Sequence, residues 1–124
     1  MNESYLLIKQ IDKRYDNIHY YIVNNNMTKV IGRFDVGCRS TAGITYHIID
    51  EYQNRGIGQT TLNFVVGDLF KNYKVEEIWI LAINDISKNI ALKSGFSKKR
   101  ERLYKLSISE CLKSKLKEND LGER

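Results

Sequence analysis

The stretch Gln53-Asn54-Arg55-Gly56-Ile57-Gly58 is the part of this sequence best suited to bind a charged ligand. It lies between a segment rich in β-branched residues and a segment with helical spacing. Two glycines one residue apart lack the Cβ atoms that would keep an anion away from the backbone. Successive amides at the start of a helix point toward one place, and the helix dipole adds positive potential there. The stretch therefore predicts a loop that binds a phosphate or a pyrophosphate.

The residues after this loop exclude two common nucleotide motifs. A P-loop needs Gly-Lys followed by Ser or Thr, whereas Gly58 is followed by Gln59 and Thr60. A dinucleotide-binding fingerprint needs a third glycine where this sequence has Thr61. Because glycine pairs also occur in ordinary turns, the loop by itself does not identify its ligand.

The elements that position the loop follow from hydrophobic periodicity. Apolar residues from Leu62 to Phe70 recur at helical spacing, which predicts a helix from Gln59 to about residues 71–74. Alternating or wholly apolar runs predict strands, and residues 77–83 read as a central strand buried on both faces. This order of elements indicates a single domain of the α+β (mixed α/β) class over residues 1–124. The predicted strands cover residues 5–11, 18–23, 28–36, 42–49, 77–83, 96–99 and 103–108, and two further helices cover residues 85–94 and 110–118.

Composition limits the function classes. The chain has 124 residues, a net charge of +5 and a sequence that is 42% hydrophobic, as in an ordinary globular domain. Its longest apolar run, Ile78 to Ile83, is too short for a membrane span, and the polar residues Met1 to Ser4 do not resemble a signal peptide. Cys38 and Cys111 lie far apart without a metal-ligand pattern, so we expect no metal and a cytoplasmic location. The late lysines favour a solvated face over a nucleic-acid surface, although a small basic nucleic-acid-binding module is kept as an alternative.

Two motifs at matching spacing resemble those of the GNAT acetyltransferases. Gln53-x-x-Gly56-x-Gly58 after a strand is similar to the pyrophosphate loop with which that family binds acyl-coenzyme A. Downstream, Asn84-Asp85-Ile86-Ser87 and then Lys93-Ser94-Gly95-Phe96 resemble the second signature, in which Asn follows the central strand and Gly-Phe ends the next helix. The strand Ile44 to Ile48 is similar to that of the branch that acetylates protein N-termini, such as those of ribosomal proteins. The resemblance covers about residues 18–108.

The resemblance implies a GNAT-like fold, in which a mainly antiparallel sheet contains a splayed parallel strand pair flanked by helices. It also implies an N-acetyltransferase that moves an acetyl group from acetyl-CoA directly to a primary amine of a protein N-terminus, a peptide or a small molecule. Pantetheine would lie where the strand ending at residues 48–50 splays from the strand ending at Asn84. The residues expected to bind acetyl-CoA are Ile48, Ile49, Asp50, Gln53, Asn54, Arg55, Gly56, Ile57, Gly58, Gln59, Thr60, Asn84 and Ser87.

The sequence departs from the family where the protons are handled. Many members have a Tyr seven residues after the Asn, but this chain has Ala91 there. The stretch where many members have a Glu base is Ala42-Gly43-Ile44, which holds no carboxylate. Ser87 therefore becomes the candidate acid, because the branch that acetylates N-termini uses a Ser there, and its other reading is a hydroxyl that caps the helix. The remaining proton-relay candidates are Tyr46 and His47, and Asp35 and Glu51 are weaker candidates for the base.

The front of the chain also departs from the family. Members usually place two helices between their first two strands, but only residues 12–21 are available here. The acceptor side is therefore expected to be open, which suits a peptide, or to be completed by a second copy in a homodimer. These departures leave a CoA-binding protein with little or no catalysis as the first alternative to an enzyme.

Overall fold

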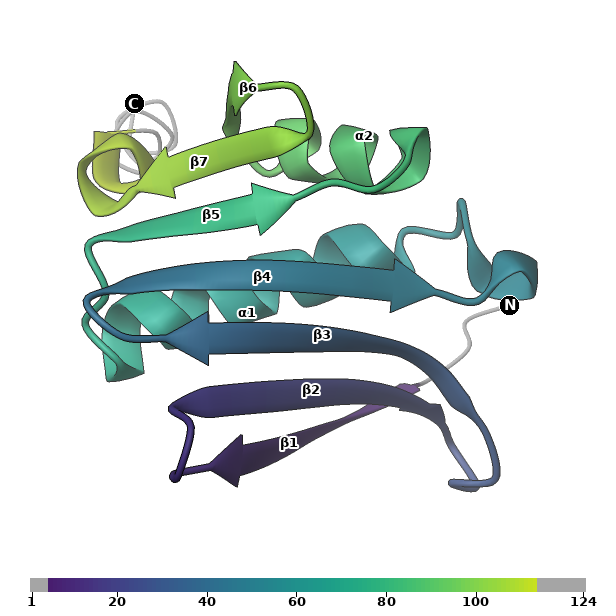
Figure 1. Cartoon of the computed structure of the whole chain (residues 1–124). Coiled ribbons are helices and arrows are strands. Elements are labelled where there is room, and N and C mark those ends of the chain that lie inside the picture. Colours follow the sequence, from purple (N-terminus) through teal and green to yellow (C-terminus); the bar gives the residue numbers. More distant parts are fainter. Residues whose placement is uncertain (1–4, 114–124) are drawn as a thin grey trace, which may run out of the picture.

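A seven-stranded sheet forms the body of the protein in its computed structural model, which describes residues 5–113 (Figure 1). The strand order is β1-β2-β3-β4-β5-β7-β6, and all neighbours are antiparallel except β4 and β5. The strands are β1 (Tyr5–Asp12), β2 (Asn17–Asn24), β3 (Val30–Cys38), β4 (Thr41–Ile48), β5 (Glu77–Leu81), β6 (Ser97–Arg100) and β7 (Leu103–Ser107). The helices are the short 3-10 helix η1 (Asp50–Tyr52), α1 (Ile57–Asn72) and α2 (Asp85–Lys93). The mixed α+β class is confirmed.

One face of the sheet is covered by helices and forms the core. In β4 every second side chain is buried, as alternation in a half-buried strand requires. Phe34 and Tyr46 stack with ring centroids 4.7 Å apart, and Leu62 and Leu69 of α1 are fully buried against this layer. The buried face of α2 includes Ala91. Both α1 and α2 lie on this face of the sheet (Figure 1). The two helices pack against each other where Gly58 of α1 approaches Ile90 of α2.

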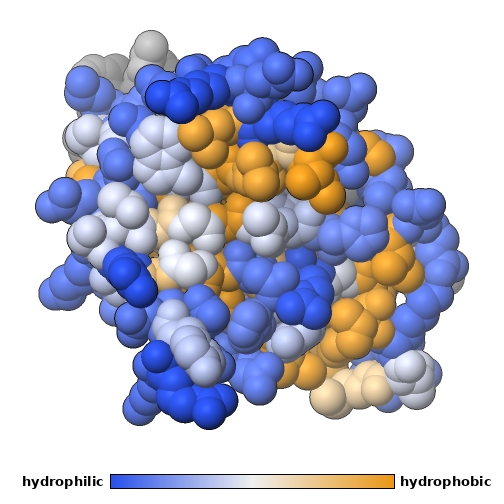
Figure 2. Space-filling model, in the orientation of Figure 1, coloured by the Kyte–Doolittle hydropathy of each residue, from blue (hydrophilic) through white to orange (hydrophobic). Residues whose placement is uncertain are grey.

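The other face of the sheet is covered by neither α1 nor α2, and Figure 1 views the molecule from this open face. Hydrophilic and hydrophobic side chains are interspersed over it (Figure 2). The prediction that residues 77–83 are buried on both faces is therefore wrong: β5 alternates, and Leu81 at its end is exposed. Trp79, which the apolar run would place in the core, is only half-buried and donates to Glu77 over 3.0 Å.

The parallel strands β4 and β5 pair over only part of their length. Paired positions run from Thr41 and Glu77 to Ile44 and Ile80, after which β4 continues to Ile48 without a partner on that side. This is the splayed parallel pair that the resemblance implied. The region where the strands part is referred to below as the β4–β5 gap.

The structure near the two ends of the described chain can be compared with the two predictions made for these regions. A four-residue turn, residues 13–16, joins β1 to β2, so the two helices that family members have at this point are absent from the described residues. Residues 108–113 are helical, and the rest of the helix predicted for 110–118 lies outside the described residues. Within residues 5–113, no helix is long and apolar enough to cross a membrane.

Candidate active site

The glycine loop ends in a helix start that has no side-chain cap. Gly56 is the N-cap residue of α1 and has a φ of +81°, a left-handed conformation that favours glycine. A Cβ built there would meet nothing within 4 Å, so the space beside the first amides is open. The first turn of α1 also contains no acidic residue. Free amides together with the positive helix end make this the expected anion-binding place.

Gln53 braces the start of this loop. Its Nε2 donates to the backbone oxygen of Ile48 at 2.8 Å and lies 3.2 Å from Oδ1 of Asp50. The side chain therefore ties the loop to the end of β4 and sets the direction in which the chain enters α1. This contact gives Gln53 a structural task in addition to its predicted role beside acetyl-CoA.

Gly58 serves close packing between helices. A Cβ at this position would lie 2.7 Å from Cδ1 of Ile90 and 3.5 Å from Cγ1 of Ile48. The missing side chain thus allows α2 to approach the first turn of α1. The two positions of the motif favour glycine for different physical reasons. Gly56 has a left-handed backbone with open space beside it, and Gly58 allows α2 to pack closely.

A polar contact between the same helices leaves a buried acceptor unused. Nε2 of Gln59 donates to Oγ of Ser94, which in turn lies 3.1 Å from Oδ1 of Asn63. Oε1 of Gln59 is buried and has no partner among the described residues. Buried polar atoms are nearly always satisfied, so this oxygen fits a donor that arrives with a ligand. The amides and hydroxyl groups of a pantetheine arm are donors of that kind.

A cleft of about 340 Å³ lies between the glycine loop and α2. It contains much of the predicted cofactor-binding loop, and α2 supplies its other wall. The residues of that wall were not predicted as site residues, although their spacing of three and four along one helix face could have revealed them. Lys93 adds a cation to a cleft whose floor is a helix start. The lining residues are Ile48, Gln53, Asn54, Gly56, Gly58, Gln59, Ile86, Asn89, Ile90 and Lys93.

Three other predicted residues, Arg55, Ile57 and Thr60, do not line this cleft but a different cavity of about 740 Å³, which β1 and α1 also line. Thr60 is exposed on α1, and its backbone amide bonds to the oxygen of Gly56 at 3.0 Å. The guanidinium of Arg55 lies 4.9 Å from the ring centre of Tyr52. Ile57 is buried under the sheet, and Ile49 donates its amide to Ile31 at 2.9 Å.

Asn84 and Ser87 form a capping box at the start of α2. Oδ1 of Asn84 accepts from the amide and the hydroxyl of Ser87, both at 2.9 Å, and the amide of Asn84 donates to Oγ of Ser87 at 3.3 Å. Ser87 is 5% exposed. The reciprocal bonds satisfy donors at the helix start, as such boxes do. Both side chains therefore have a structural task in the position where the resemblance expects cofactor and proton chemistry.

Tyr46 connects β4 to α2 across the β4–β5 gap. Its hydroxyl donates to the backbone oxygen of Ser87, and burial raises its pKa above the ordinary value for tyrosine. A phenol with a raised pKa retains its proton and is a weak acid. The ring borders a cavity of about 10 Å³, lined also by Asn84 and Ser87, which shares four lining residues with the cleft.

His47 and the two weaker base candidates lie away from the cleft. His47 is exposed on the open face, opposite Arg33 in the β3–β4 register. Partial burial would raise the pKa of Asp35, but hydrogen bonds from Arg33 and His19 outweigh it and hold that pKa below the ordinary value. Glu51 forms an ion pair with Lys29. The structure thus brings Ser87, Tyr46 and Asn84 together at the small cavity, and His47, although exposed, also lines that cavity.

Solved structures with the same fold are N-acetyltransferases. The ribosomal-protein-S5-alanine acetyltransferase from Vibrio fischeri matches with a TM-score of 0.67 at 20% identity, over 77% of this chain and 63% of that chain. The spermidine N-acetyltransferase from Vibrio cholerae in complex with CoA and spermine matches with a TM-score of 0.67 at 15% identity, over 80% of this chain and 70% of that chain. A dodecameric structure of spermidine N-acetyltransferase from Vibrio cholerae has a TM-score of 0.68 at 15% identity, over 78% of this chain and 68% of that chain.

Sequence comparison adds nothing to this result, since no family model and no curated protein sequence matches the chain. The chain spans less than two thirds of the length of the Vibrio fischeri enzyme. Among the described residues, no group of three or more His, Cys, Asp or Glu side chains could hold a metal ion. The sheet order, the parallel β4–β5 pair and these structural matches show that the chain has the fold of the GNAT acetyltransferases.

Proposed function

We propose that this protein is an acetyl-CoA-dependent N-acetyltransferase that moves an acetyl group to a primary amine by direct transfer. The observation that carries the proposal is the uncapped start of α1 at the end of a cleft that leads to the β4–β5 gap. The structurally similar spermidine enzyme was solved in complex with CoA, which supports the same ligand here.

The cleft offers a complementary group for each part of such a ligand. The first amides of α1, beside Gly56, fit a pyrophosphate, and Lys93 supplies positive charge in the lining of the cleft. The unpartnered Oε1 of Gln59 fits a donor of the pantetheine arm. Oδ1 of Asn84 is used in the helix cap, so its side-chain amide nitrogen is the group proposed to contact the pantetheine arm.

The chemistry needs a neutral amine and a proton for the leaving thiolate. Bound acetyl-CoA would supply the thioester carbonyl that the amine attacks. Ser87 is the proposed donor of the proton, since it lines the small cavity that shares four lining residues with the cleft. His47 on the open face is the proposed proton acceptor for an amine that arrives from solvent, and Tyr46 holds α2 in place behind the gap.

A second candidate function is acetyl-CoA binding with little or no catalysis. It is favoured by the capping box, because the hydroxyl proton of Ser87 already has an acceptor in Asn84. Nucleic-acid binding is not proposed, since the site geometry and the structural matches favour an acyl-CoA.

Two measurements separate these candidates. Calorimetry with acetyl-CoA should show saturable binding, and the absence of binding to folded protein would reject both. Thiol release from acetyl-CoA over a panel of peptides, protein N-termini and small amines should then show turnover that depends on the acceptor. Binding without turnover on any acceptor would leave the second candidate.

A cytoplasmic location and a homodimer also remain proposals. The two free cysteines agree with a reducing compartment. Apolar side chains of β2 and β3, among them Ile18, Ile22 and Phe34, are buried within the chain and so form no exposed patch there for a second copy. Exposed apolar side chains include Ile8 on β1, Leu81 at the end of β5 and Ile83 just after it.

A further inference from the structure

A second hollow, of about 500 Å³, lies on the open face of the sheet. It is built by β1, the β1–β2 turn, β2 and β3, and its lining differs from that of the cleft between the glycine loop and α2. The residues that line it are Gln10, Ile11, Asp12, Lys13, Arg14, His19, Tyr21 and Arg33.

The lining carries an excess of positive charge. Lys13, Arg14 and Arg33 are permanent cations of the lining. Two carboxylates offset part of this charge: Asp12 lies 3.7 Å from Arg14, and Asp35 pairs with Arg33 at 2.9 Å. The side chains of Arg14 and Arg33 are 81% and 53% exposed, so they are accessible to a ligand. A hollow with this balance favours an anionic ligand.

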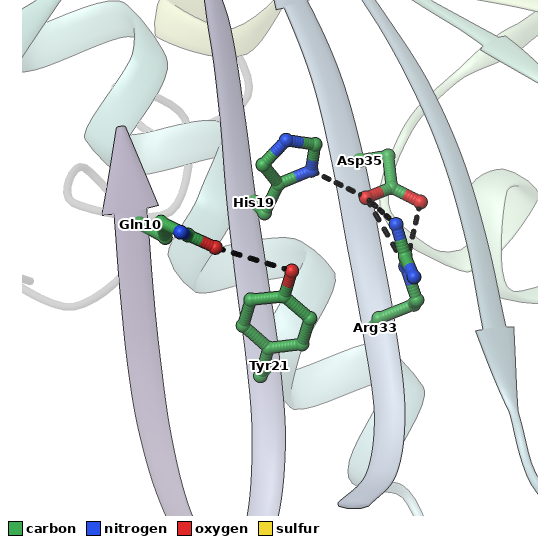
Figure 3. Close-up of polar contacts among 5 residues, drawn as sticks. All are labelled: Gln10, His19, Tyr21, Arg33 and Asp35. Carbon is green, nitrogen blue, oxygen red and sulfur yellow. Dashed lines mark hydrogen bonds and ion pairs between the residues drawn. The ribbon is translucent and has the colours of Figure 1, made fainter. Parts of the chain in front are cut away.

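Asp35 holds two groups of the hollow in position (Figure 3). Its Oδ1 lies 2.6 Å from Nδ1 of His19, and both of its oxygens accept from Arg33 over 2.9–3.2 Å. Beside them, Tyr21 donates to Gln10 over 3.3 Å, so the side chains form one layer over β1, β2 and β3. Because Nδ1 of His19 faces the carboxylate, Nε2 is the nitrogen left for a ligand.

Strand register fixes how far this hollow lies from the β4–β5 gap. His19 pairs with Asp35, which pairs with Thr45, and Thr45 is the first residue of β4 beyond the last pair with β5. Adjacent strands lie about 4.8 Å apart, so β2 is about 10 Å from β4. An extended peptide advances about 3.3 Å per residue and covers that distance in about three residues.

We propose that the hollow binds a carboxylate of the acceptor, and that the acceptor is a protein or peptide N-terminus with Asp or Glu at its third or fourth position. This inference rests on the proposed function. With its α-amine at the β4–β5 gap, such a peptide crosses β4 and β3 and brings its acidic side chain to Arg33, His19 and Arg14. The positive charge that remains after Asp12 and Asp35 are counted supplies the charge complementarity.

The test uses peptides with a free N-terminal alanine, a fluorescent label at the C-terminus, and Glu or Gln placed in turn at positions two to six. Binding to the full chain is followed by fluorescence anisotropy at low salt. The peptide with Glu at position three or four should bind about tenfold more tightly than its Gln counterpart, as expected for a charge-assisted hydrogen bond. The double variant Lys13→Glu/Arg14→Glu should lose this preference, because it reverses charge on two exposed side chains of a turn.

The double variant Lys98→Glu/Lys99→Glu is the matched control, since it makes the same charge change on exposed residues of β6, at the other edge of the sheet. It should keep the preference for Glu. Equal affinity for Glu and Gln peptides overturns the inference, as does a preference that survives charge reversal at residues 13 and 14. Tighter binding of inorganic phosphate or of a single-stranded oligonucleotide through those two residues also overturns it.

Acetyl-CoA binding and thiol release are measured on the same variants. Saturable acetyl-CoA binding and acetylation of peptides without regard to acidic residues would contradict this inference and leave the proposed function intact. Failure to bind acetyl-CoA would instead reject the proposed function.

Discussion

The two faces of the sheet differ in how a carboxylate is paired with its neighbours. On the covered face Asp68 of α1 has a side chain that is 8% exposed, and it accepts from Lys9, Tyr20 and Asn72 over 2.6–2.8 Å. On the open face Asp35, with a side chain 33% exposed, pairs with Arg33 and His19 within its own sheet. The covered face uses its polar groups to hold a helix, and the open face keeps its charges where a ligand from solvent can reach them. One alternating sheet thereby separates the proposed cofactor side from the proposed acceptor side.

The largest expected effect is on kcat, and it is tested by substituting Ser87, the proposed proton donor, and His47, the proposed proton acceptor. General acid catalysis contributes about 10²–10⁴-fold, so Ser87→Ala should lower kcat by at least about 100-fold if Ser87 is the acid. His47→Gln should lower kcat less at high pH, where free amine is already present. The measurement is thiol release under saturating acetyl-CoA, with the acetyl-CoA affinity of each variant determined by calorimetry.

A control separates acid from cap, because Ser87 also closes the capping box. Ser87→Thr retains a hydroxyl and should keep both kcat and stability near the wild-type values. Ser87→Ala should reduce the free energy of unfolding by about 1 kcal/mol through its lost hydrogen bonds. A fall in kcat of less than threefold, together with that loss of stability, would assign Ser87 to the cap alone.

The second effect tests whether the start of α1 binds an anion. Asn and Asp both tolerate the left-handed conformation of Gly56 and have the same shape, so Gly56→Asn and Gly56→Asp differ only in charge. Gly56→Asp should raise the Kd for acetyl-CoA by about tenfold or more relative to Gly56→Asn, because like charges repel at the helix start. Calorimetry of both variants at low salt measures the difference, and equal Kd values would place the pyrophosphate elsewhere.

The third effect compares the two carboxylates. For Asp68, partial burial would raise the pKa, but hydrogen bonds from Lys9, Tyr20 and Asn72 outweigh it and lower that pKa below the ordinary value, as Arg33 and His19 do for Asp35. A folded-state pKa below the unfolded value adds stability above about pH 4, and that stability is lost as the pH falls through the folded pKa. Asp68→Asn should reduce the free energy of unfolding at pH 7 by about 1–3 kcal/mol, and Asp35→Asn by less than about 1 kcal/mol.

Urea unfolding at pH 7 and at pH 3 measures both carboxylates. The difference between wild type and each variant should shrink at the lower pH, since the wild-type carboxyl group is then losing its charge. If Asp35→Asn lowers the free energy of unfolding more than Asp68→Asn does, the carboxylate that stabilises the fold more lies on the open face, and the prediction is wrong.

Sequence patterns predicted the covered face far better than the open one. Alternation and helical spacing located the strands, α1 and α2 because those patterns record which side chains are buried. The wall of the cleft at Asn89 and Lys93 was missed, because it depends on how α2 packs beside α1 and not on either helix alone. Gly58 lines the cleft as predicted for a loop residue, but its tight packing against Ile90, which a Cβ would approach to 2.7 Å, was not predicted.

The open face was misread because an apolar run does not reveal what covers it. Residues 77–83 were predicted to form a strand buried on both faces, but only alternate side chains of β5 are buried. The pairing of His19 with Asp35 depends on the register between β2 and β3, which a hairpin pattern does not fix to the residue. Charges that meet across strands were therefore invisible until the register was known.

The smallest expected effect concerns the apolar side chains that the open face leaves in solvent. Leu81 is 48% exposed at the end of β5, so Leu81→Ser removes little buried surface. If this face is free in solution, the free energy of unfolding should change by less than about 0.5 kcal/mol, as for ordinary surface substitutions. If a second copy covers the face, the substitution should lower the stability by an amount that depends on protein concentration, and it should lower the mass measured by light scattering across a dilution series. A mass near 14.5 kDa for wild type and variant alike would reject the homodimer. A mass that falls only in the variant would instead show that a second copy covers the open face, as α1 and α2 cover the other face.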